Sequence, residues 1–274
     1  MNARSRILAR AVLLGAGLLS AGAGAARAEP MGLRPLCADR PGKATPACIL
    51  DAGHLQIETG LFEISRQSQA GAHDDVDSYG AFELRAGLTR RAEAEVAWTS
   101  WIVERTRDAT GKTRSSGVGD LTLAVRAALT DPDGAGAAVS VQPFVSAPTA
   151  THGLGAGGWR GGARLPISVP AGDWTFGASP EFDVARDAAG GGTHGAWSGA
   201  VAVGRAMGAL TLGAELWGAI DDNPAGRTHQ ATFDLTAAVV PPRHADMQID
   251  VGANFGLTHD TPDVDVYVGV SRRF

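Results

Sequence analysis

The stretch that decides the fold is the C-terminal one, Val264-Asp265-Val266-Tyr267-Val268-Gly269-Val270-Ser271-Arg272-Arg273-Phe274. Valine stands at every second position from Val264 to Val270, and Asp265, Tyr267, Gly269 and Ser271 occupy the other face. Successive side chains of a strand point to opposite sides, so this alternation predicts a β-strand with one apolar face.

The N-terminus has the pattern of a secretory signal peptide. Arg4, Arg6 and Arg10 precede a short apolar run, and Ala26-Arg27-Ala28 supplies a small-x-small cleavage pattern. The alternative, an uncleaved inner-membrane helix, needs about 20 apolar residues, more than this run provides. We therefore predict that residues 1–28 are removed and that the protein is exported through the periplasm.

Charge and cysteine content narrow the class further. Cleavage after Ala28 removes four arginines and no acid, which changes the formal net charge from −5 to −9. This balance argues against nucleic acid as a partner, because phosphate binding needs a basic surface. Cys37 and Cys48 are predicted to form a disulfide in the oxidising periplasm. The alternative, a metal site, lacks the nearby histidine or second cysteine pair that tetrahedral coordination needs.

From residue 54 onward the chain consists of segments of about ten residues with alternating apolar positions, separated by turn residues, as in membrane barrels. Leu121, Leu123 and Val125, for example, interleave with Thr122, Ala124 and Arg126. The twelve predicted strands are 55–64, 82–88, 93–99, 120–129, 139–145, 159–165, 174–183, 197–203, 210–216, 232–239, 247–255 and 264–274.

The connections and the polar face favour a membrane barrel over a soluble sandwich. Short connections at 89–91, 171–173, 205–208 and 241–244 alternate with longer ones at 66–78, 103–116, 147–158 and 186–195. A dry sandwich core would not accept the carboxylates and arginines of the polar face. The aromatic residues expected to form interfacial girdles are Tyr79, Trp98, Trp101, Trp159, Trp174, Trp197 and Tyr267.

We therefore predict an all-β protein, an antiparallel up-and-down transmembrane barrel of about twelve strands, in the outer membrane of a Gram-negative bacterium. Residues 29–53 would be a periplasmic N-terminal segment with the Cys37–Cys48 loop, and residues 54–274 the barrel. Its surface would contact outer-membrane lipid. Tyr267 and Phe274 would form the C-terminal signal for the barrel-assembly machinery.

Short motifs resemble one known family. The stretch from Leu36 through Cys37, Asp39-Arg40-Pro41-Gly42 and Cys48 to Gly53-His54-Leu55 resembles the opening of outer-membrane proteins labelled as components of the meta-pathway of phenol degradation, often called "transporter". Further matching stretches are Arg85 to Thr89, Gly117 to Leu121, Leu165-Pro166, Pro180-Glu181 and Asn254 to Thr258. The resemblance covers the mature chain and implies a small barrel that admits small organic compounds, aromatic ones included.

Charged residues on the inward face are the candidate functional residues. The predicted lumen-lining set is Glu58, Glu83, Arg85, Glu93, Glu95, Asp120, Arg126, Arg164, Glu181, Asp183, Glu215, Asp234 and Asp250. Acids outnumber arginines in this set, so a lumen of this kind would favour cations or bind a polar solute. The alternative is a network of paired charges that fills the interior. A barrel of about 8 strands is filled by side chains and one of 16–18 leaves an open channel, so twelve lies between.

Other chemistry finds less support. The clusters His73-Asp74-Asp75-Val76-Asp77 and His259-Asp260-Thr261-Pro262-Asp263 are rich in oxygen ligands for calcium, but aspartate is also common in turns. We predict no metal site, no cofactor and no enzymatic activity, because hydrolase and metalloprotease motifs are missing from the sequence. The predicted function is passive passage of small molecules through a polar lumen. The alternatives are a closed structural or adhesive barrel and, third, a lipid-modifying enzyme.

Overall fold

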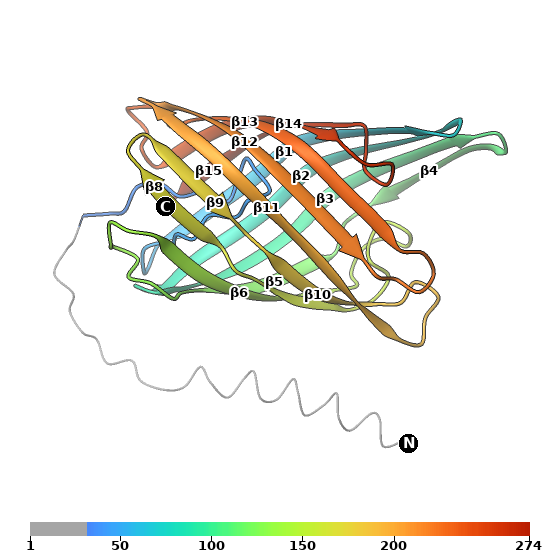
Figure 1. Ribbon diagram of the computed structural model, residues 1–274, viewed down its shortest axis with the longest axis horizontal. Coiled ribbons are helices and arrows are strands. Elements are labelled where there is room, and N and C mark those ends of the chain that lie inside the picture. The colour runs from blue at the N-terminus through green and yellow to red at the C-terminus, as the bar shows by residue number, and fades with distance from the viewer. Residues whose placement is uncertain (1–31) are drawn as a thin grey trace, which may run out of the picture. The chain divides into compact units, whose positions relative to one another are not determined.

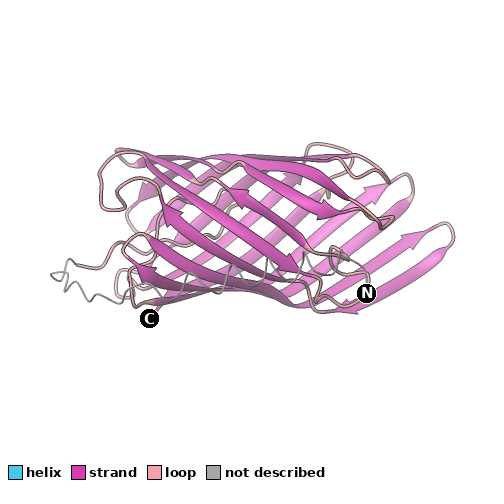
Figure 2. Ribbon diagram, turned by 90° about the horizontal axis from the view of Figure 1, so that it is seen from below, coloured by secondary structure: helices cyan, strands magenta, loops and turns pink. Residues whose placement is uncertain are grey.

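The computed structural model describes residues 32–274 of the chain, and the predicted signal peptide, residues 1–28, lies outside them. All regular elements within 32–274 are strands, paired antiparallel (Figure 2). Their bounds are β1 Leu55–Gln69, β2 Ala72–Thr89, β3 Ala92–Asp108, β4 Gly111–Gly117, β5 Leu121–Ala128, β6 Ala138–Ala147, β7 Arg160–Arg164, β8 Ile167–Ala171, β9 Trp174–Ala178, β10 Glu181–Arg186, β11 Thr193–Met207, β12 Leu210–Asp221, β13 Thr228–Val239, β14 Met247–Gly256 and β15 Val264–Arg273. In the same residues no helix has the length and apolar character needed to cross a membrane.

The fifteen segments form twelve barrel strands, as predicted. β4 and β5 both pair with β3, β7 and β8 both pair with β6, and β9 and β10 both pair with β11. Each of these three pairs is one strand interrupted near a glycine or a proline. β15 pairs with β1 and closes the barrel.

The alternation of the C-terminal strand has the predicted consequence. In β15, Asp265, Tyr267 and Ser271 are buried, whereas Val266 is 41% exposed in the isolated chain. The apolar face is therefore the outer wall and the polar face lines the interior. Tyr267 corrects one prediction, because it faces inward against Arg40 and does not belong to a girdle. Tyr79, Trp101, Trp159, Trp174 and Trp197 are exposed as expected.

Two predicted long loops are instead hairpins. Residues 66–78 continue β1 and β2 up to a two-residue turn, where Ala70 and Gly71 have φ of 48° and 87°. Left-handed residues of this kind permit the tight turns that join antiparallel strands. Residues 103–116 similarly continue β3 and β4. Their polar composition obscures the strand alternation on which the sequence prediction relied.

The inside–outside pattern of β1 shifts in its middle. Glu58 is buried, yet Phe62 and Ile64, also at even positions, are exposed. The register of β1 against β15 is irregular between Gly60 and Phe62, and Gly80 in the neighbouring β2 has φ of 62°. A left-handed residue inside a strand changes the direction of the side chains beyond it. Beyond this shift, Phe62 and Ile64 lie on the outward face.

The two ends of the barrel differ. At the terminal end, β1 begins and β15 ends, and residues 34–51 lie inside the wall, drawn in blue in Figure 1. At the opposite end, which we call the hairpin end, β4 and its partner β3 extend past their neighbours (Figure 1).

Candidate functional site

Residues 34–51, which we call the N-terminal plug, contact inward side chains on several sides of the terminal end. The amide groups of Asp39 and Arg40 donate hydrogen bonds to Glu58 in β1, at 2.9 and 3.1 Å. The Lys43 amide donates to Glu215 in β12, at 2.7 Å. Carboxylates of the wall therefore hold the plug by its backbone as well as by its charges.

On one side, Asp39 lies between two fully buried arginines, Arg85 of β2 and Arg126 of β5. Asp39 is 3.1 Å from Arg85 and also forms an ion pair with Arg126. Arg85 also pairs with Glu58 at 2.9 Å and with Glu93 at 2.7 Å. Burial tends to raise the pKa of the Asp39 carboxyl, but Arg126 and Arg85 outweigh it and lower this pKa to about 2. Asp39 is therefore ionised, and it joins the two arginines, which also pair with Glu58, Glu93 and Glu95 of the wall.

On the other side of the plug, the plug supplies the positively charged side chains and the barrel wall supplies the carboxylates. Arg40 pairs with buried Asp250 of β14 at 3.1 Å. Lys43 lies 3.7 Å from buried Asp234 of β13 and 4.7 Å from the centre of the Trp217 ring. The Lys43–Asp234 contact is longer than those of Asp39, whereas the Arg40–Asp250 contact equals that of Asp39 with Arg85.

The predicted disulfide is present within the plug. Cys37 and Cys48 are joined, with their Cα atoms 6.4 Å apart. The carbonyl groups of both cysteines accept hydrogen bonds, from Arg85 at 2.8 Å and from Arg126 at 3.3 Å. The bond therefore closes the loop that carries Asp39, Arg40 and Lys43. It lies next to the two buried arginines, Arg85 and Arg126.

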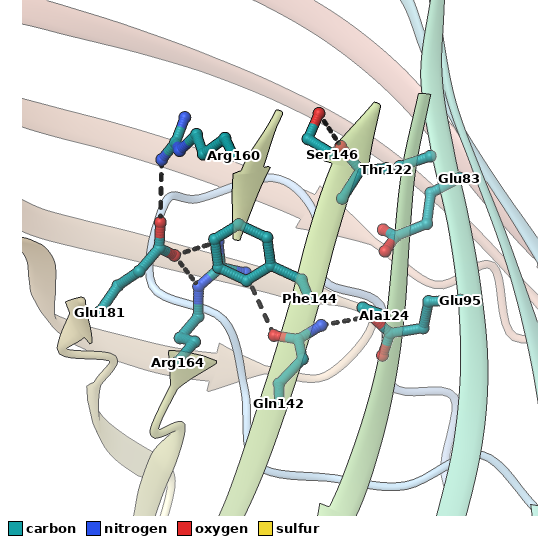
Figure 3. Close-up of a pocket in the computed structure, with 11 residues that line it drawn as sticks. Glu83, Glu95, Thr122, Ala124, Gln142, Phe144, Ser146, Arg160, Arg164 and Glu181 are labelled. Carbon is teal, nitrogen blue, oxygen red and sulfur yellow. Dashed lines mark hydrogen bonds and ion pairs between the residues drawn. The ribbon is translucent and has the colours of Figure 1, made fainter. Parts of the chain in front are cut away.

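Beyond the plug, toward the hairpin end, the lumen contains adjoining cavities of about 230, 460 and 310 Å³. Glu83 of β2 lines all three of them. In the first cavity Glu83 and Glu95 lie across from Arg160, Arg164 and Glu181, with Gln142 and Phe144 between them (Figure 3). The cavities are polar and border on plug residues.

The basic wall of the cavity is part of a second ion-pair network. Arg160 and Arg164 of β7 both contact Glu181 of β10, and Arg160 also contacts Asp183. Gln142 accepts from Arg164 at 3.2 Å and donates to Glu95, so an amide connects the basic wall to the acidic wall. The two walls of the cavity therefore differ in charge: paired arginines line one side, and Glu83 lines the other.

The structure places the predicted lumen residues as follows. Ten of the thirteen are buried, namely Glu58, Arg85, Glu93, Glu95, Arg126, Glu181, Asp183, Glu215, Asp234 and Asp250. Glu83, Asp120 and Arg164 are half-buried and border cavities. Asp120 accepts hydrogen bonds from the amides of Ala150 and Ala156 and so anchors a connection at the hairpin end. Most of the set therefore meets in networks around the plug, and its part in solute selection remains a prediction.

Sequence reasoning missed the plug residues Asp39, Arg40 and Lys43 as well as Arg160. The first three precede the first strand, where no periodicity indicates an inward direction. The only signal was indirect, a disulfide-closed loop with charges of both signs next to a strand. The segment was predicted as periplasmic with bounds 29–53, and its inward position depends on pairing with residues far along the chain.

The two acidic loop clusters have structural contacts. Asp75 and Asp77 lie in β2 and pair with Arg66, at 3.4 and 2.8 Å. Asp260 and Asp263 accept hydrogen bonds from backbone amides of neighbouring strands. Within residues 32–274, one group of carboxylates with metal-ligand spacing occurs, Asp39, Glu83 and Glu95, with oxygens within 4.8 Å of one another. Asp39 in that group already pairs with two arginines.

Comparison with known proteins agrees with this architecture. No protein of curated function matches the sequence. The chain is similar to an outer-membrane channel from Pseudomonas putida F1, with 16% identity, a TM-score of 0.63 and coverage of 86% of this chain and 99% of that one. It is also similar to the beta domain of the Bordetella autotransporter Brka, with 13% identity, a TM-score of 0.57 and coverage of 82% and 100%. At these identities the likeness shows the fold, an outer-membrane barrel. Residues 38–274 match the family described as "Putative MetA-pathway of phenol degradation", and because this match spans nearly all of the described residues, the chain belongs to that family.

Proposed function

We propose that the protein is an outer-membrane channel for passive passage of small organic molecules, aromatic ones included, through its polar lumen. The observation that carries this proposal is the row of polar cavities of about 230 to 460 Å³ between the plug and the hairpin end. Spaces of this size hold small organic molecules. The similar structure from Pseudomonas putida F1 is itself described as an outer-membrane channel, which supports the proposal.

The charges of the lumen supply the selectivity. Near the cavities, Glu83 has no hydrogen bond or ion pair with any other residue of 32–274, whereas Arg160 and Arg164 are offset by Glu181 and Asp183. The side chain left without a partner is therefore acidic, and in its ionised form it adds negative charge to the lumen. A ring of carboxylates favours cations over anions, so we expect neutral and cationic solutes to pass more readily than anionic ones.

The orientation of the barrel in the membrane is part of the same proposal. The terminal end, with both ends of the barrel sequence, would face the periplasm, and the hairpin end would face the exterior. The chain would be exported through the periplasm and inserted by the barrel-assembly machinery, with Phe274 at the C-terminus as part of the signal. The exposed apolar face would contact outer-membrane lipid.

A closed structural barrel is the second candidate, and the plug favours it. Ion pairs hold the plug to β2, β5, β13 and β14, which surround the lumen at the terminal end. A plug that never moves would leave only narrow paths between itself and the wall.

We assign no catalytic role. The best candidate base is His194, which is buried in β11 and lies between Asp187 and Asp221. Each of its ring nitrogens is 2.9 Å from one of these carboxylates. Because a general base needs a free nitrogen directed at a substrate, this histidine is better suited to holding the two connections of the hairpin end together.

Solute flux through liposomes tests the two candidates. The refolded mature chain would be compared with a variant that lacks residues 34–51, using neutral, cationic and anionic solutes of matched size. Flux through the full-length chain, with anions slowest, supports the selective channel. Flux through the deletion variant alone supports the closed barrel. Absence of flux from both, with heat-dependent gel mobility showing folded barrels, overturns the channel.

A further inference from the structure

The outward face of the β3–β4 hairpin carries an unusual concentration of positive charge. Arg105 lies directly opposite Arg114, and Arg107 lies directly opposite Lys112. Residues two apart on a strand share a face, so all four side chains lie on the same side. Like charges directly opposite one another destabilise a strand pair. An anion bound between them would offset this repulsion.

Neighbouring acids compensate only part of this charge. Asp77 pairs with Arg105 at 2.6 Å and with Arg66 at 2.8 Å. No ion pair or side-chain hydrogen bond among residues 32–274 involves Arg107, Lys112 or Arg114, and all three are exposed. A hollow of about 470 Å³ lies beside them, lined also by His73 and by Asp75, whose carboxylate pairs with Arg66 at 3.4 Å. We call Arg66, Arg105, Arg107, Lys112 and Arg114 the basic hairpin surface.

The position of this surface relative to the apolar wall indicates the kind of anion. Phe62, Tyr79 and Trp101 lie in register on adjacent strands and are exposed on the outward face. Aromatic bands of this kind mark the interface between hydrocarbon and headgroups. Arg105 is on the same face four residues beyond Trp101, which corresponds to about 13 Å along the strand. The basic hairpin surface therefore lies just outside the apolar layer, on the part of the β3–β4 hairpin that extends past its neighbours (Figure 1).

We propose that the basic hairpin surface binds the phosphate groups of a phosphorylated lipid of the outer leaflet. Guanidinium and ammonium groups form charge-assisted hydrogen bonds with phosphate oxygens. The aromatic band below would contact the acyl chains of the same molecule, which a free phosphate could not use. This site does not depend on solute passage through the lumen, but its place in the outer leaflet rests on the orientation proposed above.

Lipid binding to the complete mature chain in detergent tests the proposal. The probe is lipid A, a diphosphorylated glycolipid, and the readout is its apparent affinity by native mass spectrometry. The variant is R107Q/K112Q/R114Q. The matched control, R91Q/R205Q/R243Q, removes the same charge from exposed arginines at the terminal end. Each basic residue at an anionic lipid surface contributes roughly fivefold, so we expect about 100-fold weaker binding for the variant and little change for the control.

Three outcomes would overturn the proposal. The first is unchanged affinity of the hairpin variant. The second is an equal loss in the variant and the control, which would indicate unspecific attraction. The third is displacement of lipid A by inorganic phosphate at similar concentration, which would indicate a site for a soluble anion. Heat-dependent gel mobility would verify folding. If the triple variant does not fold, the exposed Arg114→Gln substitution alone should still weaken binding roughly fivefold.

Discussion

The two sides of the N-terminal plug are held to the wall in different ways. Asp39 contacts two arginines whose side chains are 0% exposed. Arg40 and Lys43, on the other side, keep 18% and 26% of their side chains exposed, although their acidic partners are fully buried. Asp39 is itself 12% exposed, so the sides differ mainly in their pairing: Asp39 has two buried arginine partners, whereas Lys43 has one acidic partner at 3.7 Å. The Asp39 side should therefore act as the fixed attachment and the Lys43 side as the part that releases.

The largest effect is expected from Arg126→Gln, which breaks the fixed side. Glu95 and Asp39 would lose a buried partner, so the free energy of unfolding should fall by about 3–5 kcal/mol. Denaturant titration in detergent micelles, followed by tryptophan fluorescence, measures this change. Arg90→Gln is the control, because Arg90 pairs with Asp131 and Asp133 at the surface and exposed pairs contribute about 0–1 kcal/mol. Equal effects of the two substitutions would contradict the difference between buried and exposed pairs.

The disulfide connects the two sides, and its loss should have the next largest effect. Replacing Cys37 and Cys48 by serine frees the plug loop when it leaves the wall, which should weaken docking by about 2–4 kcal/mol. Limited proteolysis should then cut within residues 34–51 faster, with the barrel intact. Reduced wild-type protein is the matched control and should behave like the variant. Resistance of the serine variant to cleavage would show that the ion pairs alone fix the plug.

Lys43→Met tests the releasing side. It removes the ion pair with Asp234 and the hydrogen bond to Thr232, at 3.7 and 2.9 Å. Because the Lys43–Asp234 contact is long, at 3.7 Å, and Lys43 is partly exposed, we expect only about 1 kcal/mol of weaker docking. Single-channel recording should show more frequent opening than in wild type, with unchanged denaturant midpoint. If Lys43→Met opens the channel no more often than wild type, the assignment of a releasing side is wrong.

The smallest effect concerns pH at the first residue of the plug. Arg34 pairs with Asp133, and this hydrogen bond lowers the pKa of Asp133 to about 2 from its ordinary 3.8. The folded pKa is below the unfolded one, so the stabilisation is complete above about pH 4 and is lost as the pH falls toward 2. Carboxyl NMR titration should show this midpoint, and Arg34→Gln should move it upward. A midpoint near 3.8 in the wild type would mean that the pair does not persist in solution.

The alternation of apolar and polar residues was sufficient to predict the barrel strands. It was not sufficient to predict the hairpins or the plug inside the barrel. Strands such as Leu210–Asp221 and Met247–Gly256 have a period of two because one face meets lipid and the other polar groups. The hairpins beyond the membrane have polar residues on both faces, so they were predicted as loops. The change of face near Gly80 depends on one left-handed residue, which alternation alone does not reveal. Tyr267 was assigned to a girdle because aromatics are common there, but it stands on the polar face of β15 and packs against Arg40 of the plug.

The inward direction of the charged side chains was predicted, but their ion-pair partners were not. Arg85 and Arg126 stand on polar faces, so their direction followed from periodicity. Their pairing with Asp39 joins residues 46 and 87 positions apart in the chain. Contacts at such separations depend on how the strands close, which no local pattern encodes. Glu83, Arg160 and Arg164 likewise come together only because β2 and β7 face each other across the lumen.

The position of the plug has a consequence for the order of assembly. The plug leaves the ribosome before every strand, whereas the β1–β15 seam joins Glu58 to Ser271 and can form only after the last strand is made. Once the cylinder is sealed, a segment that is still outside can enter only through one of its two ends. We therefore expect the cylinder to close around the plug, so that Asp39 is in place when Arg85 and Arg126 leave water. A segment made before any strand is thereby expected to lie inside the barrel when the last seam, between β1 and β15, forms.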